Sequence, residues 1–134
     1  MSDQSLRAAA EDAMTNAYAP YSNFRVGAAV KSGDGRVFVG CNVENASYNL
    51  GICAERSAIA SAVTAGSRTF ESLALVSDSD SPASPCGACR QVLAEFAPGL
   101  RITSYGLNGD VAEWTVAELL PHQFRLNNGN ETNE

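Results

Sequence analysis

Three cysteines and one glutamate in this sequence have the types and spacing that could hold and use a metal ion. Cys86 and Cys89 are three residues apart at the start of an expected helix, so both sulfur atoms should lie on one helix face. Cys53 begins another expected helix, and the N-terminus of a helix favours a thiolate over a thiol. Three thiolates that converge from two helix starts predict a metal site, and Zn²⁺ is the usual ion for such soft ligands.

Cys41 and Glu55 decide whether that metal would be structural or catalytic. Structural zinc sites are closed by four protein ligands, whereas catalytic sites keep one position for water. Cys41 shares a face of an expected strand with Val39 and Val43, so we expect it to be a small residue in an apolar core row. The fourth zinc position would then stay open. Glu55, two residues after Cys53, could accept a proton from water whose pKa zinc lowers to about 7.

Simpler interpretations of the same residues stay open at this point. Cys86 and Cys89 could be a redox-active Cys-x-x-Cys pair, although such a pair does not require a distant Cys-x-Glu. A closed zinc site with Cys41 as its fourth ligand would be purely structural. Glu55 could be a solvated carboxylate that the helix dipole favours.

Composition restricts the classes of protein that this chain could represent. It has 134 residues, with 9 Lys and Arg against 15 Asp and Glu, for a net charge of −6 at pH 7. Nucleic-acid binders neutralise phosphates with Lys and Arg, so we expect no nucleic-acid partner. No apolar stretch is long enough for a membrane helix, and 1–4 shows no start of a secretory signal. We therefore expect a cytoplasmic protein with reduced thiols and a small-molecule substrate.

Hydrophobic periodicity and turn residues predict alternating helices and strands. The expected helices are 5–18, 53–65, 85–96 and 115–120, and the expected strands are 24–30, 37–43, 73–76 and 100–105. This order predicts a single-domain three-layer α/β/α sandwich with a mixed sheet of about five strands. The catalytic domain should span 1–126, followed by a polar C-terminal tail at 127–134.

Four segments in register resemble the small homotetrameric cytidine deaminases. They are Phe24-Arg25-Val26-Gly27-Ala28, Cys41-Asn42-Val43-Glu44-Asn45-Ala46-Ser47-Tyr48, Cys53-Ala54-Glu55-Arg56 and Pro85-Cys86-Gly87-Ala88-Cys89-Arg90-Gln91. The resemblance runs from the first expected helix to Leu119-Leu120-Pro121, which is nearly the whole chain. Zinc deaminases also share a three-Cys ligand variant, a Glu that is not a ligand and a Pro-Cys-x-x-Cys element.

The resemblance implies an activity and a cofactor. The reaction would be zinc-dependent hydrolytic deamination of cytidine and 2′-deoxycytidine to uridine and 2′-deoxyuridine, with release of ammonia, in pyrimidine salvage. One Zn²⁺ per subunit would be held by Cys53, Cys86 and Cys89, and Glu55 would be the proton shuttle. Blasticidin-S deaminases are similar in size and zinc motif, so they define an alternative substrate. A deaminase of RNA or DNA and a purely structural zinc module are the other hypotheses.

The resemblance also implies substrate contacts. Asn42 and Glu44 would hold the ribose, Phe24 would pack on the base, and the Ala54 N–H would meet a pyrimidine oxygen. Without the resemblance, Asn42 and Glu44 would be an exposed polar strand face, and Phe24 would be a core aromatic.

Residues near the chain end and beside the thiols complete this prediction. Tyr48 and Phe124 match residues that complete the pockets of neighbouring subunits in the homotetramer, although Phe124 could instead be a hydrophobic anchor. His122, the only histidine, is expected at the surface. Arg56 could donate hydrogen bonds to the thiolates and offset their excess negative charge, or it could lie on an exposed helix face.

Overall fold

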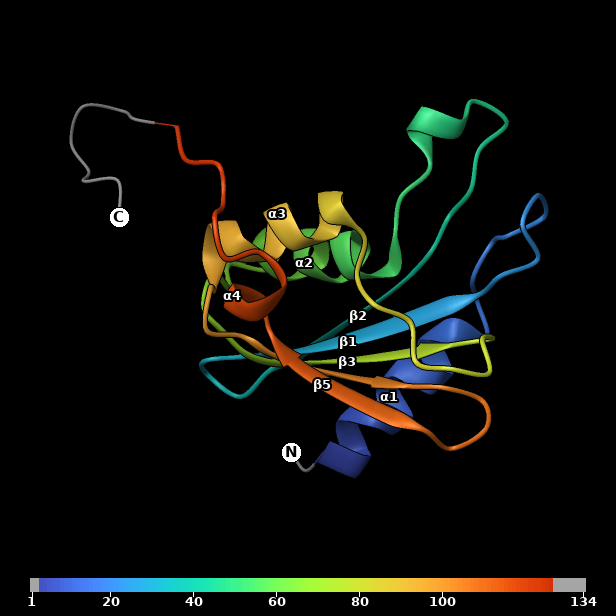
Figure 1. The fold of residues 1–134 in the computed structure, drawn as a ribbon, viewed down its shortest axis with the longest axis horizontal. Coiled ribbons are helices and arrows are strands. Elements are labelled where there is room, and N and C mark those ends of the chain that lie inside the picture. The colour runs from blue at the N-terminus through green and yellow to red at the C-terminus, as the bar shows by residue number, and fades with distance from the viewer. Residues whose placement is uncertain (1–2, 127–134) are drawn as a thin grey trace.

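A mixed five-stranded sheet organises the chain in a computed structural model that describes residues 3–126 (Figure 1). Its strands are β1 (Val26–Ser32), β2 (Val37–Cys41), β3 (Phe70–Ser77), β4 (Arg101–Tyr105) and β5 (Val111–Thr115). They lie in the order β2-β1-β3-β4-β5, and only β3 and β4 run parallel to each other. The expected polar tail of 127–134 lies outside the described residues.

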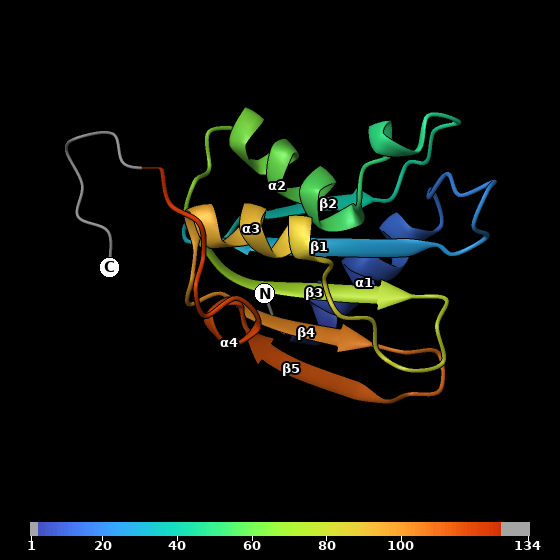
Figure 2. The same cartoon turned by 45° about the horizontal axis from the view of Figure 1, so that its top comes forward.

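Helices cover both faces of this sheet. They are α1 (Asp3–Met14), α2 (Ala54–Thr64), α3 (Gly87–Phe96) and α4 (Val116–Leu119), with a short 3₁₀ helix at Tyr48–Leu50. The first helix, α1, lies on one face, whereas α2, α3 and α4 lie on the other (Figures 1 and 2). The expected three-layer α/β/α sandwich is therefore confirmed. None of the helices within 3–126 is long and apolar enough to cross a membrane.

The alternation of side chains along β1 and β3 divides the apolar core into two layers. In β1, Ala28 and Val30 belong to the cluster beneath α2 and α3, whereas Ala29 belongs to the cluster beneath α1. In β3, Leu75 and Ala74 divide in the same way. Because helices cover both faces, these central strands read as nearly continuous apolar runs rather than as alternating apolar and polar residues.

The parallel pair determines where a ligand can bind. Parallel neighbours need a crossover, and the chain makes it from β3 through 78–86 and α3 to β4 (Figure 2). The loop 78–86 leaves the carboxyl end of β3 at the edge where β1 begins and β2 ends, because β1 is antiparallel to both. In sheets of this kind, ligands bind outside the carboxyl ends of the parallel strands.

Most expected elements are found with shifted ends, and two differ more strongly from the sequence prediction. The first helix ends at Met14 rather than at residue 18, because the backbone of Tyr18 bonds to the segment after β2 instead. Tyr18 N donates to Asn42 O at 3.0 Å, and Glu44 N donates to Tyr18 O at 2.8 Å. The sequence patterns also did not predict β5. It is a short edge strand in which buried and exposed side chains alternate only weakly.

The apolar row around Cys41 is not a core row within one chain, so that expectation is wrong. Val39 and Val43 are each 44 % exposed, and Cys41 is half-buried. The reason is that β2 is an edge strand whose outward row is only partly covered. Its opposite face is tightly covered, because a Cβ at Gly40 would lie 2.6 Å from Ala54 O in α2.

Gly40→Ala should therefore destabilise the fold. The added methyl would collide with backbone atoms of Ala54 and Ala58, which cannot move without displacing α2. Overpacking of this kind costs about 1–3 kcal/mol of unfolding free energy, measurable by urea denaturation. Gly99→Ala is the matched control, since its Cβ would meet nothing within 4 Å. Equal urea midpoints for the two variants would contradict the close packing of α2 on β2.

Candidate functional site

The three predicted thiols meet at the edge of the sheet. Cys53 is the N-cap residue of α2, Cys86 is the N-cap residue of α3, and Cys89 lies in the first turn of α3. The Sγ atoms are 3.9 Å apart for Cys53 and Cys86 and 3.4 Å apart for Cys86 and Cys89. Within residues 3–126 this is the one group of three or more potential metal-ligating side chains found, with all three atoms within 4.8 Å of one another.

This geometry fits zinc with three protein ligands. Tetrahedral Zn–S bonds of about 2.3 Å place neighbouring sulfur atoms roughly 3.8 Å apart, close to the two measured separations. Cys41 is not part of the cluster. The structure therefore does not support a closed four-Cys site, and the participation of Cys53 argues against a simple redox pair of Cys86 and Cys89.

Charge in the thiol cluster is concentrated on Cys53. Hydrogen bonds from Cys89, Arg56 and Cys86 lower the pKa of Cys53 to about 5, with the bond from Cys89 contributing most. The same bond to Cys53, together with burial, raises the pKa of Cys89. Arg56 Nη2 lies 3.5 Å from Cys53 Sγ and 3.4 Å from Gly51 O, so Arg56 faces the cluster rather than an exposed helix face.

Glu55 is a buried carboxylate beside these thiols. It lies in the first turn of α2 and is only 6 % exposed. Burial is the main cause that raises the pKa of Glu55, and the negative charge of Cys53 raises it further. A hydrogen bond with Cys89 acts in the opposite direction. Glu55 is thus not a solvated helix-start carboxylate, and its environment strengthens its hold on a proton, as suits a group that takes up and releases protons.

A pocket of about 380 Å³ opens beside the cluster. Its walls come from the residues around the start of β1, the segment after β2, the start of α2, strand β3 and the loop before α3. The lining residues are Phe24, Val26, Asn42, Val43, Glu44, Tyr48, Gly51, Ile52, Cys53, Ala54, Glu55, Arg56, Leu75, Ala83, Ser84 and Cys86. The pocket has the size of a small-molecule site. It brings together every predicted site residue except two, which are Cys89, which is buried, and Phe124, which is exposed elsewhere on the surface.

Asn42 anchors the backbone on both sides of Arg25. Its Oδ1 accepts from Val26 N at 2.9 Å, and its Nδ2 donates to Phe24 O at 2.8 Å. Phe24 lies in the loop before β1 and is 37 % exposed at the pocket wall. It is therefore not a core aromatic, and its ring is available to a ligand.

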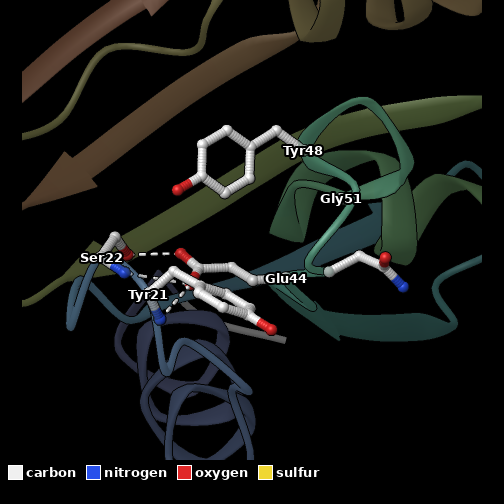
Figure 3. A pocket seen from close by; sticks show the side chains of 6 residues that line it. Tyr21, Ser22, Glu44, Tyr48 and Gly51 are labelled. Carbon is white, nitrogen blue, oxygen red and sulfur yellow. Dashed lines mark hydrogen bonds between the residues drawn. The ribbon is translucent and has the colours of Figure 1, made fainter.

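Glu44 holds the preceding turn of the same loop. Its Oε1 accepts from Tyr21 N at 3.0 Å and from Ser22 N at 3.1 Å, and Ser22 Oγ donates to its Oε2 (Figure 3). The bond from Ser22 is the main cause that lowers the pKa of Glu44. Phe24 N in turn donates to Ser22 Oγ at 3.0 Å. Asn42 and Glu44 thus build one wall of the pocket and fix Phe24 in it.

A second hollow of about 370 Å³ adjoins this wall and is shown in Figure 3. It shares Glu44, Tyr48 and Gly51 with the first pocket. Tyr48 is 79 % exposed, and Phe124 is 70 % exposed and lines neither space. His122 is exposed, as expected.

Sequence reasoning gave no role to four residues that support the site. Tyr21 and Ser22 bond to Glu44 from 23 and 22 positions away in the sequence. Arg90 and Gln91 follow Cys89 and bond to distant carbonyl groups. The only available signal was the position of Arg90 directly after a thiol motif.

Comparison with known proteins agrees with this geometry. A family model described as the cytidine and deoxycytidylate deaminase zinc-binding region matches residues 1–105. The cytidine deaminase of Sporosarcina psychrophila is 49 % identical over 125 residues, which are 92 % of each chain. The crystal structure of cytidine deaminase from Burkholderia pseudomallei superposes with a TM-score of 0.89 at 50 % identity, covering 92 % of this chain and 100 % of that one. The blasticidin-S deaminase of Bacillus cereus is more distant, with 30 % identity over 110 residues, 76 % of this chain and 78 % of that protein.

Replacing Cys53, Cys86 or Cys89 by serine should remove zinc. Loss of a sulfur ligand should weaken zinc affinity by more than the roughly 10- to 100-fold caused by loss of a residue that only supports a ligand. Cys41→Ser is the matched control and should keep one zinc per chain, because Cys41 lies outside the cluster. Mass spectrometry of the metal content after gel filtration measures both. Zinc loss in Cys41→Ser would contradict the three-ligand site.

Proposed function

The chain belongs to the family of zinc-dependent cytidine deaminases, and on this basis we propose that it hydrolyses cytidine and 2′-deoxycytidine to uridine and 2′-deoxyuridine with release of ammonia. The observation that carries the proposal is the cluster of Cys53, Cys86 and Cys89 at the base of a pocket, with the buried Glu55 beside it. The proposal extends to a place in pyrimidine salvage and to the cytoplasm, where thiols stay reduced and able to bind a metal.

Three thiolates would hold one Zn²⁺ per chain. The ion supplies a Lewis acid that lowers the pKa of water to about 7. Three negative ligands weaken that Lewis acidity, so positive groups around them matter. Arg56 and the N-termini of α2 and α3 supply such groups at the thiols.

Glu55 would move the protons of the reaction. As a carboxylate it accepts a proton from the attacking water and delivers it to ring N3, which makes C4 electrophilic. It then carries a second proton from the new C4 hydroxyl group to the amino group, so that the C4–N bond breaks, ammonia leaves and C4 becomes the carbonyl carbon of uridine. Burial supports this role, because it raises the pKa of Glu55 toward the range in which both proton transfers are efficient.

The remaining pocket residues would orient the nucleoside. Phe24 would pack on the base, and Ala54, the first residue of α2, would offer a backbone N–H that the helix itself does not use. Asn42 and Glu44 would hold the ribose hydroxyl groups, and the lowered pKa of Glu44 keeps it an ionised acceptor. This pair favours a nucleoside over blasticidin S, and a comparison of rates on the two substrates tests the alternative.

A homotetramer with shared active sites completes the proposal. Tyr48 and Phe124 are among the most exposed large apolar side chains of the described chain. Val39 and Val43, on the outer row of edge strand β2 and its extension, are also exposed. Apolar surface of this kind beside a pocket marks a protein interface, and a neighbouring subunit would cover it.

Glu55→Gln should keep zinc and lose turnover. The amide has nearly the same shape as the carboxylate but cannot shuttle protons, so kcat should fall by about 10²- to 10⁴-fold. An absorbance assay with cytidine and 2′-deoxycytidine, run beside zinc quantification, measures both effects. Deamination at a near wild-type rate by zinc-loaded Glu55→Gln would overturn the assignment.

Phe124→Ala should raise KM more than it lowers kcat. Aromatic contacts with a base are worth about 1–3 kcal/mol each, so loss of an aromatic side chain that completes the neighbouring pocket should raise KM by about 10-fold. Sedimentation should give about 56 kDa for four chains of 14.1 kDa each. Leu126→Ala removes another exposed apolar side chain and should leave KM unchanged. A monomeric, fully active enzyme would contradict the shared site.

A further inference from the structure

Arg90 connects two segments that are far apart in the sequence. Its Nε donates to Pro85 O at 2.8 Å and its Nη2 donates to Ser84 Oγ at 2.7 Å. Its Nη1 donates to Leu119 O at 3.0 Å. The guanidinium is planar and rigid, so each of its three nitrogen atoms fixes one acceptor relative to the other two.

The first segment positions the thiol that has the least support. Cys86 is the exposed member of the cluster, and as N-cap of α3 it makes no capping bond with its side chain. Cys89, by contrast, is buried within the helix. Further back in the same loop, Ser104 Oγ donates to Ala83 O at 2.6 Å. The position of Cys86 Sγ thus depends on how Pro85 is held.

The second segment leads to Phe124. Leu119 ends α4 and packs with Leu120 against the main core cluster. Further along, Gln91 Nε2 donates to Phe124 O at 3.0 Å. Two consecutive residues of α3, directly after the last thiol, therefore hold the C-terminal segment at two carbonyl groups.

We propose that Arg90 is a positioning residue that couples the Cys86 side of the metal site to the C-terminal segment 119–124. The guanidinium of Arg90 donates to acceptors in both segments. Displacement of either segment would therefore shift the guanidinium and weaken its hydrogen bonds to the other segment. Zinc binding should therefore order 119–124, and an ordered segment should slow the release of zinc. The inference rests on the proposed zinc site and assigns a role to a residue outside the ligand set and the pocket lining.

Zinc transfer to a chromophoric chelator, well below the unfolding temperature, tests the first half. Arg90→Lys keeps the charge but cannot reach three acceptors, and it should release zinc about 10-fold or more faster than wild type. Ser84→Ala removes one acceptor at an exposed position and should give a smaller increase in the same direction. Leu6→Ala creates a cavity beneath α1, on the far face of the sheet, and controls for lost stability alone.

Hydrogen exchange tests the second half. Removal of zinc from the wild type should speed amide exchange in 120–124, and this difference should disappear in Arg90→Lys, because coupling between two sites is reciprocal. Gln91→Ala should speed exchange near Phe124, but it leaves the bond between Arg90 and Leu119 in place, so the release of zinc should speed up much less than in Arg90→Lys.

The outcomes separate this inference from the proposed function. Zinc release from Arg90→Lys no faster than from Leu6→Ala, or equally fast from Gln91→Ala, would overturn the coupling and leave the deaminase proposal intact. A wild-type chain that binds no zinc would overturn both.

Discussion

Like charges must be held together at one point of the fold, because the Sγ atoms of Cys53, Cys86 and Cys89 lie within 4.8 Å of one another beside the buried Glu55. Two thiolates at about 4 Å repel by roughly 4 kcal/mol at an effective dielectric constant of about 20. The metal-free protein relieves this repulsion by keeping protons on part of the cluster: the hydrogen bond to Cys53 and burial raise the pKa of Cys89, and burial raises the pKa of Glu55. Uptake of a divalent cation would displace these protons, and the positive charge of the ion would then offset the repulsion between the thiolates. Placing two of the three sulfur atoms at helix N-termini, with Arg56 against one of them, lowers the cost further.

The pocket wall that Asn42 and Glu44 build has a different task, because it must hold the aromatic ring of Phe24 in place although Phe24 lies in a loop. The backbone around Phe24 is bonded on one side to Asn42 and on the other to Ser22, which Glu44 holds. Asn23 has a φ of 58°, a conformation that asparagine tolerates better than most residues. Because polar groups fix the backbone, the face of the ring stays free for a ligand. Such preorganisation reduces the ordering cost of binding.

The sequence predicted those parts of the site that depend on local spacing. Helix starts at Cys53 and Cys86, the thiol positions and the three-layer fold follow from patterns within a few residues. The prediction that Cys41 lies in a buried core row was wrong, because an alternating pattern does not reveal whether a strand lies at the edge of its sheet. Ser22 and Arg90 could not be assigned either, since the contacts of Ser22 with Glu44 and of Arg90 with Leu119 span 22 and 29 positions. Contacts at such separations exist only once the topology brings the segments together.

A single chain leaves the pocket open on one side. Val43 and Tyr48 line it and yet are 44 % and 79 % exposed. Glu55 is buried within the single chain already, so a cover on this side would serve to exclude water from a bound nucleoside rather than from Glu55. The chain reaches outward with Phe124, which lines neither of its own hollows and is held by the helix that carries Cys86 and Cys89. A symmetric assembly in which each chain covers the pocket of another would meet this need without further elements. Metal binding within one subunit would then bear on how well it closes the site of its neighbour.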